Sequence, residues 1–188
     1  MLLHSKGQGF ESLSAHVTNR NRQLAGGFFA LGLFAVAELI LNARIGTSFT
    51  KLLFEGNTMS IVVFAAGCVI GMAWEYVGQF ALDWWHYPPI QRHRWLFALL
   101  PVFWGLFMLI MQDGYAIART LGLAPLAAVL VSTLTIGFLI EGINLYTRSW
   151  VYSGWMSSLP LLAIGWIFFL ASTFVIGFNT YFINPFGL

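Results

Sequence analysis

The sequence predicts an all-α fold: a polytopic membrane helix bundle of five transmembrane helices, containing a parallel repeat of a two-helix unit. The first reason is composition, because the 188 residues are 59% hydrophobic and only 9% charged. Soluble domains carry about 25% charged residues. The second reason is that the apolar residues form long runs. The third is that two of these runs share one pattern around a glutamate.

Five apolar segments are long enough to cross a bilayer, which takes about 20 helical residues. Backbone amides find no hydrogen-bonding partner in lipid, so a spanning segment must be a helix or a strand of a closed barrel. The sequence lacks the period-2 alternation of barrel strands, which favours helices. The predicted helices lie near residues 24–43, 60–82, 95–112, 122–146 and 156–177.

The distribution of charge predicts the orientation of these helices. Residues 24–188 are expected to form one transmembrane domain, preceded by a polar, loosely ordered arm over residues 1–23 without a cleavable signal peptide. Lys and Arg gather on the cytoplasmic side of membrane proteins. One side of the predicted bundle carries Lys6, Arg20, Arg22, Arg92, Arg94 and Arg148, and the other side carries Arg44, Lys51 and Arg119. We therefore expect a multi-pass protein of a bacterial inner membrane, with a cytoplasmic N-terminus and an external C-terminus.

Two segments resemble each other at a constant offset. Residues 70–84 read IGMAWEYVGQFALDW, and residues 136–150 read IGFLIEGINLYTRSW. Isoleucine, glycine, glutamate and tryptophan coincide in this alignment. Both segments would start from the same side of the membrane, which predicts a parallel duplication of a helix pair. The alternative is chance similarity between apolar segments.

The paired glutamates of this repeat, Glu75 and Glu141, are the principal candidate site. Gln79 follows the first acid by four residues and Asn144 follows the second by three, so each acid shares a helix face with an amide. A carboxyl group inside a membrane must be protonated, hydrogen-bonded or close to water. The pattern indicates a site for a proton, a cation or a polar substrate. The alternative is a helix–helix hydrogen-bond lock, worth about 1 kcal/mol per bond.

Aromatic residues follow both predicted helices at their cytoplasmic ends. Trp and Tyr prefer the headgroup region of a bilayer, which favours an interfacial aromatic belt over an aromatic-lined ligand site. The predicted belt consists of Trp84, Trp85, Tyr87, Trp150, Tyr152 and Trp155.

Few residues indicate a cofactor or a catalytic centre. His86 is a weak candidate metal ligand beside Asp83 or Glu75, but a full ligand set is lacking. No phosphate loop, nucleophile elbow or HExxH motif is present, so no catalytic residue and no cofactor is predicted. Bound lipid, quinone or pigment would be compatible with the apolar chain. The nine basic residues are scattered, which argues against a nucleic-acid partner.

The Trp-Glu-Tyr sequence at residues 74–76, followed by Trp-His-Tyr-Pro at residues 85–88, resembles a group of uncharacterised bacterial multi-span membrane proteins. That group carries a Trp-Glu-Tyr motif and then a W-x-Y element. The resemblance covers about residues 71–110, with an echo at 137–170. Where the pattern commonly has Asn three residues after Glu, this chain has Gly78 in the first copy and Asn144 in the second. The resemblance implies a helical scaffold and no particular activity.

Three functions agree with these observations. The first is a non-catalytic integral subunit or scaffold of a larger membrane complex, in contact with lipid and other membrane subunits. The second is a small transporter or permease component that uses Glu75 and Glu141. The third is a membrane enzyme acting on a lipid or isoprenoid, which would need a partner base or electrophile that the sequence does not show.

Overall fold

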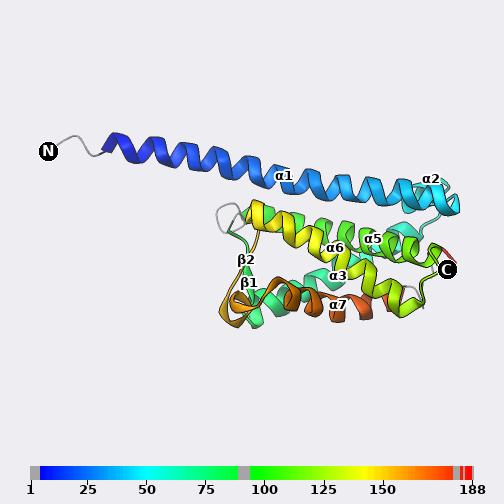
Figure 1. The fold of residues 1–188 in the computed structure, drawn as a ribbon. Helices are drawn as coiled ribbons and strands as arrows, with labels where there is room; N and C mark the ends of the chain where they lie inside the picture. The colour runs from blue at the N-terminus through cyan, green and yellow to red at the C-terminus, as the bar shows by residue number, and fades with distance from the viewer. Residues whose placement is uncertain (1–4, 89–93, 180–182, 184, 188) are drawn as a thin grey trace.

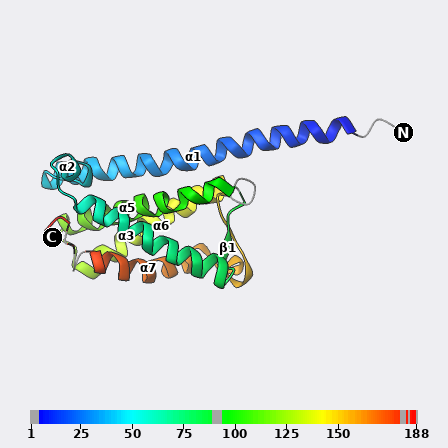
Figure 2. The same ribbon diagram turned by 180° about the vertical axis from the view of Figure 1, so that it is seen from behind.

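The computed structural model describes residues 5–88, 94–179, 183 and 185–187. Its long helices lie side by side in a bundle (Figures 1 and 2). They are α1 (Ser5–Ile45), α3 (Met59–Glu75), α5 (Leu100–Thr120), α6 (Pro125–Thr147) and α7 (Leu161–Phe178). The predicted all-α helix bundle is therefore confirmed.

Among the described residues, four helical segments are long and apolar enough to cross a membrane. They are Ala25–Ile45, Met59–Ala81, Arg94–Thr120 and Pro125–Thr147. They match the first four predicted segments in order, although the third continues well past its predicted end at residue 112. The fifth predicted segment, residues 156–177, covers all of α7 except its last residue, and α7 is not one of these four. Arg92, which contributed to the predicted orientation, lies outside the described residues.

Helix α1 is longer than the sequence predicted. It begins at Ser5 rather than near residue 24, so residues 5–23 of the predicted N-terminal arm are helical in the structure. Once a helix has formed, each further residue adds one hydrogen bond, so a polar extension needs no apolar stripe of its own. The N-terminal part of α1 projects beyond the end of the bundle where β1 and β2 lie (Figure 1).

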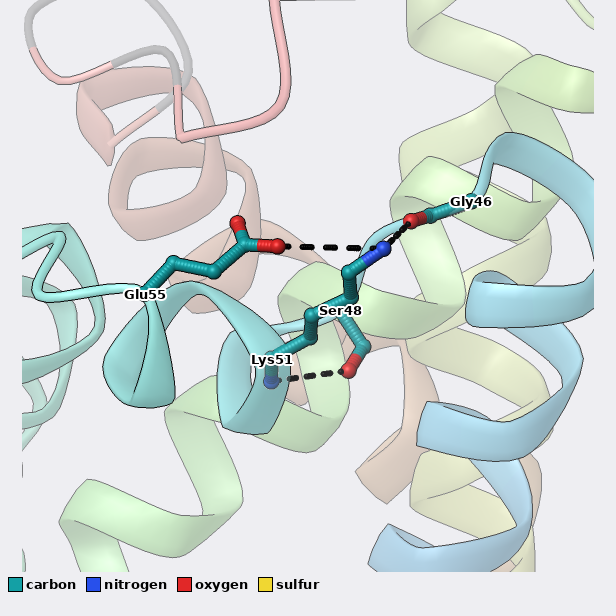
Figure 3. A network of polar contacts seen from close by, with 4 residues as sticks. All are labelled: Gly46, Ser48, Lys51 and Glu55. Atoms are coloured by element: carbon teal, nitrogen blue, oxygen red, sulfur yellow. Dashed lines mark hydrogen bonds and ion pairs between the residues drawn. The ribbon is translucent and has the colours of Figure 1, made fainter.

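A sharp reversal joins α1 to the short helix α2 (Phe49–Phe54). Gly46 adopts a positive φ of 72° at the end of α1, a conformation that glycine accepts without strain. The Ser48 side chain then caps α2 by accepting from the backbone N of Lys51 at 3.3 Å. The Lys51 ammonium donates to the Gly46 carbonyl at 2.6 Å and pairs with Glu55 at 3.8 Å (Figure 3). These contacts hold α2 against the end of α1.

The remaining helices form two units with the same order of helix, strand, 3-10 helix and helix. In the first unit, α3 continues as the π-helix η1 (Tyr76–Ala81), and then come β1 (Trp85–His86), the 3-10 helix η2 (Arg94–Leu99) and α5. In the second unit, α6 precedes β2 (Val151–Tyr152), the 3-10 helix η3 (Gly154–Ser158) and α7. β1 and β2 pair in antiparallel register at the end of the bundle opposite α2 (Figure 1).

Glycines allow α3 and α5 to approach closely. A Cβ atom on Gly67 would overlap the side chain of Met108 and the backbone of α5, and a Cβ atom on Gly105 would overlap the Phe64 ring. The main buried apolar cluster lies between α5 and α6, around Met111. This packing fixes the ends of the helices, on which the candidate site is built.

Candidate functional site

Glu75 is completely buried at the end of α3 and accepts three hydrogen bonds. Trp85 Nε1 donates to Oε2 at 3.0 Å, Tyr87 Oη donates to Oε1 at 2.6 Å, and Trp104 Nε1 donates to Oε1 at 2.8 Å. The donors come from β1, the residue after it, and α5. A single carboxyl group therefore ties together the parts of the first unit.

Two glycines make room for the indole donors. A Cβ atom on Gly71 would overlap the Trp104 indole, and a Cβ atom on Gly78 would overlap the Trp85 indole. Gly71 lies one turn before Glu75 and Gly78 about one turn after it, so all three residues share one helix face. The glycines let both rings pack directly on the helix while their N–H groups reach the carboxyl group.

The chain turns sharply between Glu75 and its first two donors. Helix α3 widens into the π-helix η1, a rare form that occurs often at functional sites. Asp83 then adopts a positive φ of 49°, a left-handed conformation that Asp tolerates better than most residues. The turn sends Trp85 and Tyr87 back toward Glu75.

Glu141 occupies the corresponding position near the end of α6, and it is also buried. Tyr152 Oη donates to its Oε1 at 2.5 Å, and Trp150 Nε1 donates to the Tyr152 hydroxyl at 3.2 Å. Arg148 ends α6 with a positive φ of 53°. Asn144 fixes the turn, because its Oδ1 accepts from Trp150 N at 3.1 Å and its Nδ2 donates to Trp150 O at 3.2 Å.

The β1–β2 pair brings the two acid sites together. The paired residues are Trp85 with Tyr152 and His86 with Val151. The next pair outward, Tyr87 and Trp150, is in ring contact, with centroids 6.5 Å apart. The donors of the two glutamates thus form one continuous aromatic layer at this end of the bundle.

The two phenols remain neutral donors over a wide pH range. Burial, followed by the charge of Glu75, raises the pKa of Tyr87 well above its ordinary value. Burial, followed by the charge of Glu141, likewise raises the pKa of Tyr152. Each hydroxyl therefore keeps the proton that it donates to its glutamate.

The predicted acids both lie in this layer, but the predicted amides are not their main partners. Gln79 is half-buried and makes no hydrogen bond to Glu75 within the described residues. Asn144 binds the backbone of Trp150, although its side chain also lies close to Glu141. Hydroxyl and indole donors take the place of the amides because the chain folds back after each helix.

Three members of the predicted aromatic belt donate hydrogen bonds to carboxyl groups of the protein. Trp85 is buried, and Tyr87 and Tyr152 are half-buried. The physical reason is that a buried indole or phenol needs a hydrogen-bond partner, which the glutamates supply within the protein.

The other three belt residues are Trp84, Trp150 and Trp155. Trp84 packs edge-on against Trp155, with ring centroids 5.7 Å apart. Trp155 is exposed, as a belt residue should be, and Trp84 and Trp150 are half-buried.

His86, the weak candidate for a metal ligand, lies at this end of the bundle. His86 is half-buried in β1, opposite Val151. Within residues 5–88, 94–179, 183 and 185–187 there is no group of three His, Cys, Asp or Glu side chains able to hold a metal ion.

The sequence analysis did not predict two side chains that contact buried acids in the structure. Trp104 lies 29 residues after Glu75, and the signal that could have found it is the glycine one turn before the acid, which marks a closely packed partner. Asp113 lies just beyond the predicted end of the third helix, yet it is fully buried in α5. Its carboxyl group interacts with that of Glu38 in α1.

Comparison with known proteins adds no assignment: no protein-family model matches the chain, and no curated protein or solved structure is significantly similar to it.

Proposed function

We propose that the protein is an integral membrane subunit or scaffold of a larger membrane complex, in which Glu75 has a structural and not a catalytic role. The main support for the proposal is that donors from the same chain surround and bind this acid. Both oxygens accept hydrogen bonds, and the residue has no exposed surface. A general acid or a transport site must reach its substrate, whereas among the described residues this carboxyl group bonds only to other parts of the first unit.

We further propose five membrane spans, with α7 as the fifth and the β1–β2 end in the cytoplasm. Helix α7 has 18 residues and is strongly apolar, which brings it close to the length that a bilayer needs. The excess of Lys and Arg on the side of the β1–β2 end supports a cytoplasmic N-terminus.

A parallel duplication of the helix pair belongs to the same proposal, and the spacing of the donors supports it. In each unit a residue with positive φ is followed two residues later by a tryptophan and four residues later by a tyrosine. These residues are Asp83, Trp85 and Tyr87 in the first unit, and Arg148, Trp150 and Tyr152 in the second.

The strand register supports the duplication independently. Adding 65 to the residue numbers of the first unit places Trp85 on Trp150 and Tyr87 on Tyr152. The Trp85–Tyr152 pair then corresponds to the Tyr87–Trp150 pair, whose rings are in contact. The ladder is then symmetric about its His86–Val151 pair, as a twofold relation between two copies requires.

The π-helix accounts for a one-residue difference in length between the proposed copies. Glu75 precedes Asp83 by eight residues, whereas Glu141 precedes Arg148 by seven. A π-helical turn bonds each residue to the fifth one along instead of the fourth, so it takes up an extra residue. The copies therefore share an offset of 66 up to the glutamates and 65 after η1, so Trp150 corresponds to Trp85 and not to Trp84, with which the sequence alignment paired it.

The apolar outer surface supports a partner subunit as well as lipid. Large side chains of α1 are exposed, among them Phe28 and Leu39, which are 73% and 71% exposed. Native mass spectrometry after gentle extraction from the native membrane tests the proposal. We expect a co-purifying membrane protein in stoichiometric amount. A monomer carrying only lipid would contradict the proposal and favour the transporter alternative.

A further inference from the structure

Glu38 and Asp113 lie nearer the other end of the bundle. Asp113 has no exposed surface, and within the described residues neither of its carboxyl oxygens receives a hydrogen bond from a protein donor. Glu38 is also buried, and its carboxyl group lies close to that of Asp113. Leaving a buried polar group without a partner costs about 1–3 kcal/mol, and more for a charged group. The described part of the chain thus offers Asp113 no partner except a second acid.

The register of α1 against α5 places the two acids at one level. Arg44 Nε donates to Thr120 Oγ1 at 3.0 Å. Arg44 follows Glu38 by six residues, and Thr120 follows Asp113 by seven. The two helices run in the same direction and pack against each other (Figure 2). The approach of the carboxyl groups thus agrees with an independent contact between the same helices.

Backbone donors occupy both carboxyl oxygens of Glu38. Its Oε1 accepts from Phe49 N at 2.9 Å, and its Oε2 accepts from Thr50 N at 2.7 Å. These are the first amides of α2, which have no partner within the helix. Glu38 is therefore fixed as a hydrogen-bond acceptor at the junction of α1 and α2.

The Lys and Arg side chains at this end of the bundle bind groups other than Glu38 and Asp113. Lys51 binds the Gly46 carbonyl and Glu55 (Figure 3). Arg119 Nη1 donates to a backbone carbonyl at 2.8 Å, and Arg44 makes the interhelical contact described above. Within the described part of the chain, no Lys or Arg forms an ion pair with either buried acid.

We propose that Glu38 and Asp113 form a proton-binding pair in which Asp113 carries the proton and donates a hydrogen bond to Glu38. Two adjacent carboxylates in a low-dielectric interior repel each other, so one of them takes up a proton. The proton stays on Asp113, since Glu38 already accepts two backbone bonds. The pair then ties α5 to α1 and, through Glu38, to the start of α2. Loss of the proton would leave two facing anions and loosen this junction.

Infrared spectroscopy of the full chain in lipid nanodiscs at neutral pH tests the pair. A protonated carboxyl group has a carbonyl stretch distinct from that of a carboxylate. We expect one such band to disappear in Asp113→Asn while the fold is retained, because the Asn amide can donate to Glu38 in place of the acid. The band should persist in the controls Glu55→Gln, which changes an exposed acid, and Glu141→Gln.

Two results would overturn the proposal. An Asp113→Asn spectrum identical to that of the wild type would mean that Asp113 is ionised. A wild-type band that disappears when sodium chloride is added at constant pH would mean that a metal cation occupies the pair. If Asp113→Asn does not fold, Asp113→Glu keeps the acid but changes its hydrogen bond. The band must then shift, and an unmoved band would exclude Asp113 as its source.

Discussion

Replacing Glu75 by Gln tests whether the aromatic donors stabilise the fold through this carboxyl group. The two side chains have nearly the same shape, so the change acts on hydrogen bonding and charge. Gln keeps one acceptor oxygen, which can serve Tyr87 and Trp104 at the Oε1 position. Its NH2 group must then face Trp85 Nε1, which is itself a donor. Turning the amide over would break two hydrogen bonds instead of one.

The cost of the substitution follows from this donor–donor contact. Trp85 is buried, and its N–H would lose the acceptor that it has in the wild type. Leaving such a group unsatisfied lowers the free energy of unfolding by about 1–3 kcal/mol. Taking a loss of about 2 kcal/mol, the melting temperature should fall by roughly 4–8 °C for a chain of this size.

Glu141→Gln is the matched control for this variant. Glu141 accepts a short bond from Tyr152, and the Gln oxygen can accept it while the NH2 group turns away from the hydroxyl. We expect a fall in melting temperature less than half of that for Glu75→Gln. Both would be measured by circular dichroism during thermal unfolding in the same detergent. Equal melting temperatures for Glu75→Gln and the wild type would refute the role of the Trp85 bond.

Three further outcomes are expected. Gly78→Ala should lower the melting temperature by several degrees, since its Cβ overlaps the Trp85 ring, while Gly137→Ala, which meets no such overlap, should leave it unchanged. The raised pKa of Tyr87 means that its stabilisation is complete below pH ~10, the ordinary tyrosine pKa, and is lost as pH rises through the higher folded value. Tyr87→Phe should therefore reduce the fall in melting temperature between neutral and strongly alkaline pH. A cysteine introduced as Ser12→Cys should resist an impermeant thiol reagent in intact cells, and labelling would reverse the proposed orientation.

The burial of Glu75 could be predicted from the sequence, whereas its partners could not. An acid within an apolar run must face the protein, because lipid cannot solvate it. Reasoning from helix faces extends only one turn, which led to Gln79. The true donors Trp85 and Tyr87 return through a π-helix and a residue with positive φ, and hydrophobic periodicity reveals neither of these.

The same limitation explains why Asp113 was missed. The predicted helix ended at residue 112, directly before this acid. In the structure α5 continues to Thr120, because Tyr115, Ala116 and Ala118 are buried and extend its packed face. An acid that resembled the boundary of a span is therefore an interior residue, and only the packing of α1 against α5 shows this.

The two glutamates of the aromatic layer differ in where their donors come from. Gly71 receives the Trp104 indole, and α5 thereby supplies a third donor to Glu75. Gly137 holds the same place before Glu141, but among the described residues nothing lies within 4 Å of the position its Cβ would take. Within the described part of the chain, Glu141 is held from the β2 side, by Tyr152 with Trp150 and Asn144 beside it. A change in α5 at Trp104 should therefore weaken the hold on Glu75 and leave that on Glu141 intact.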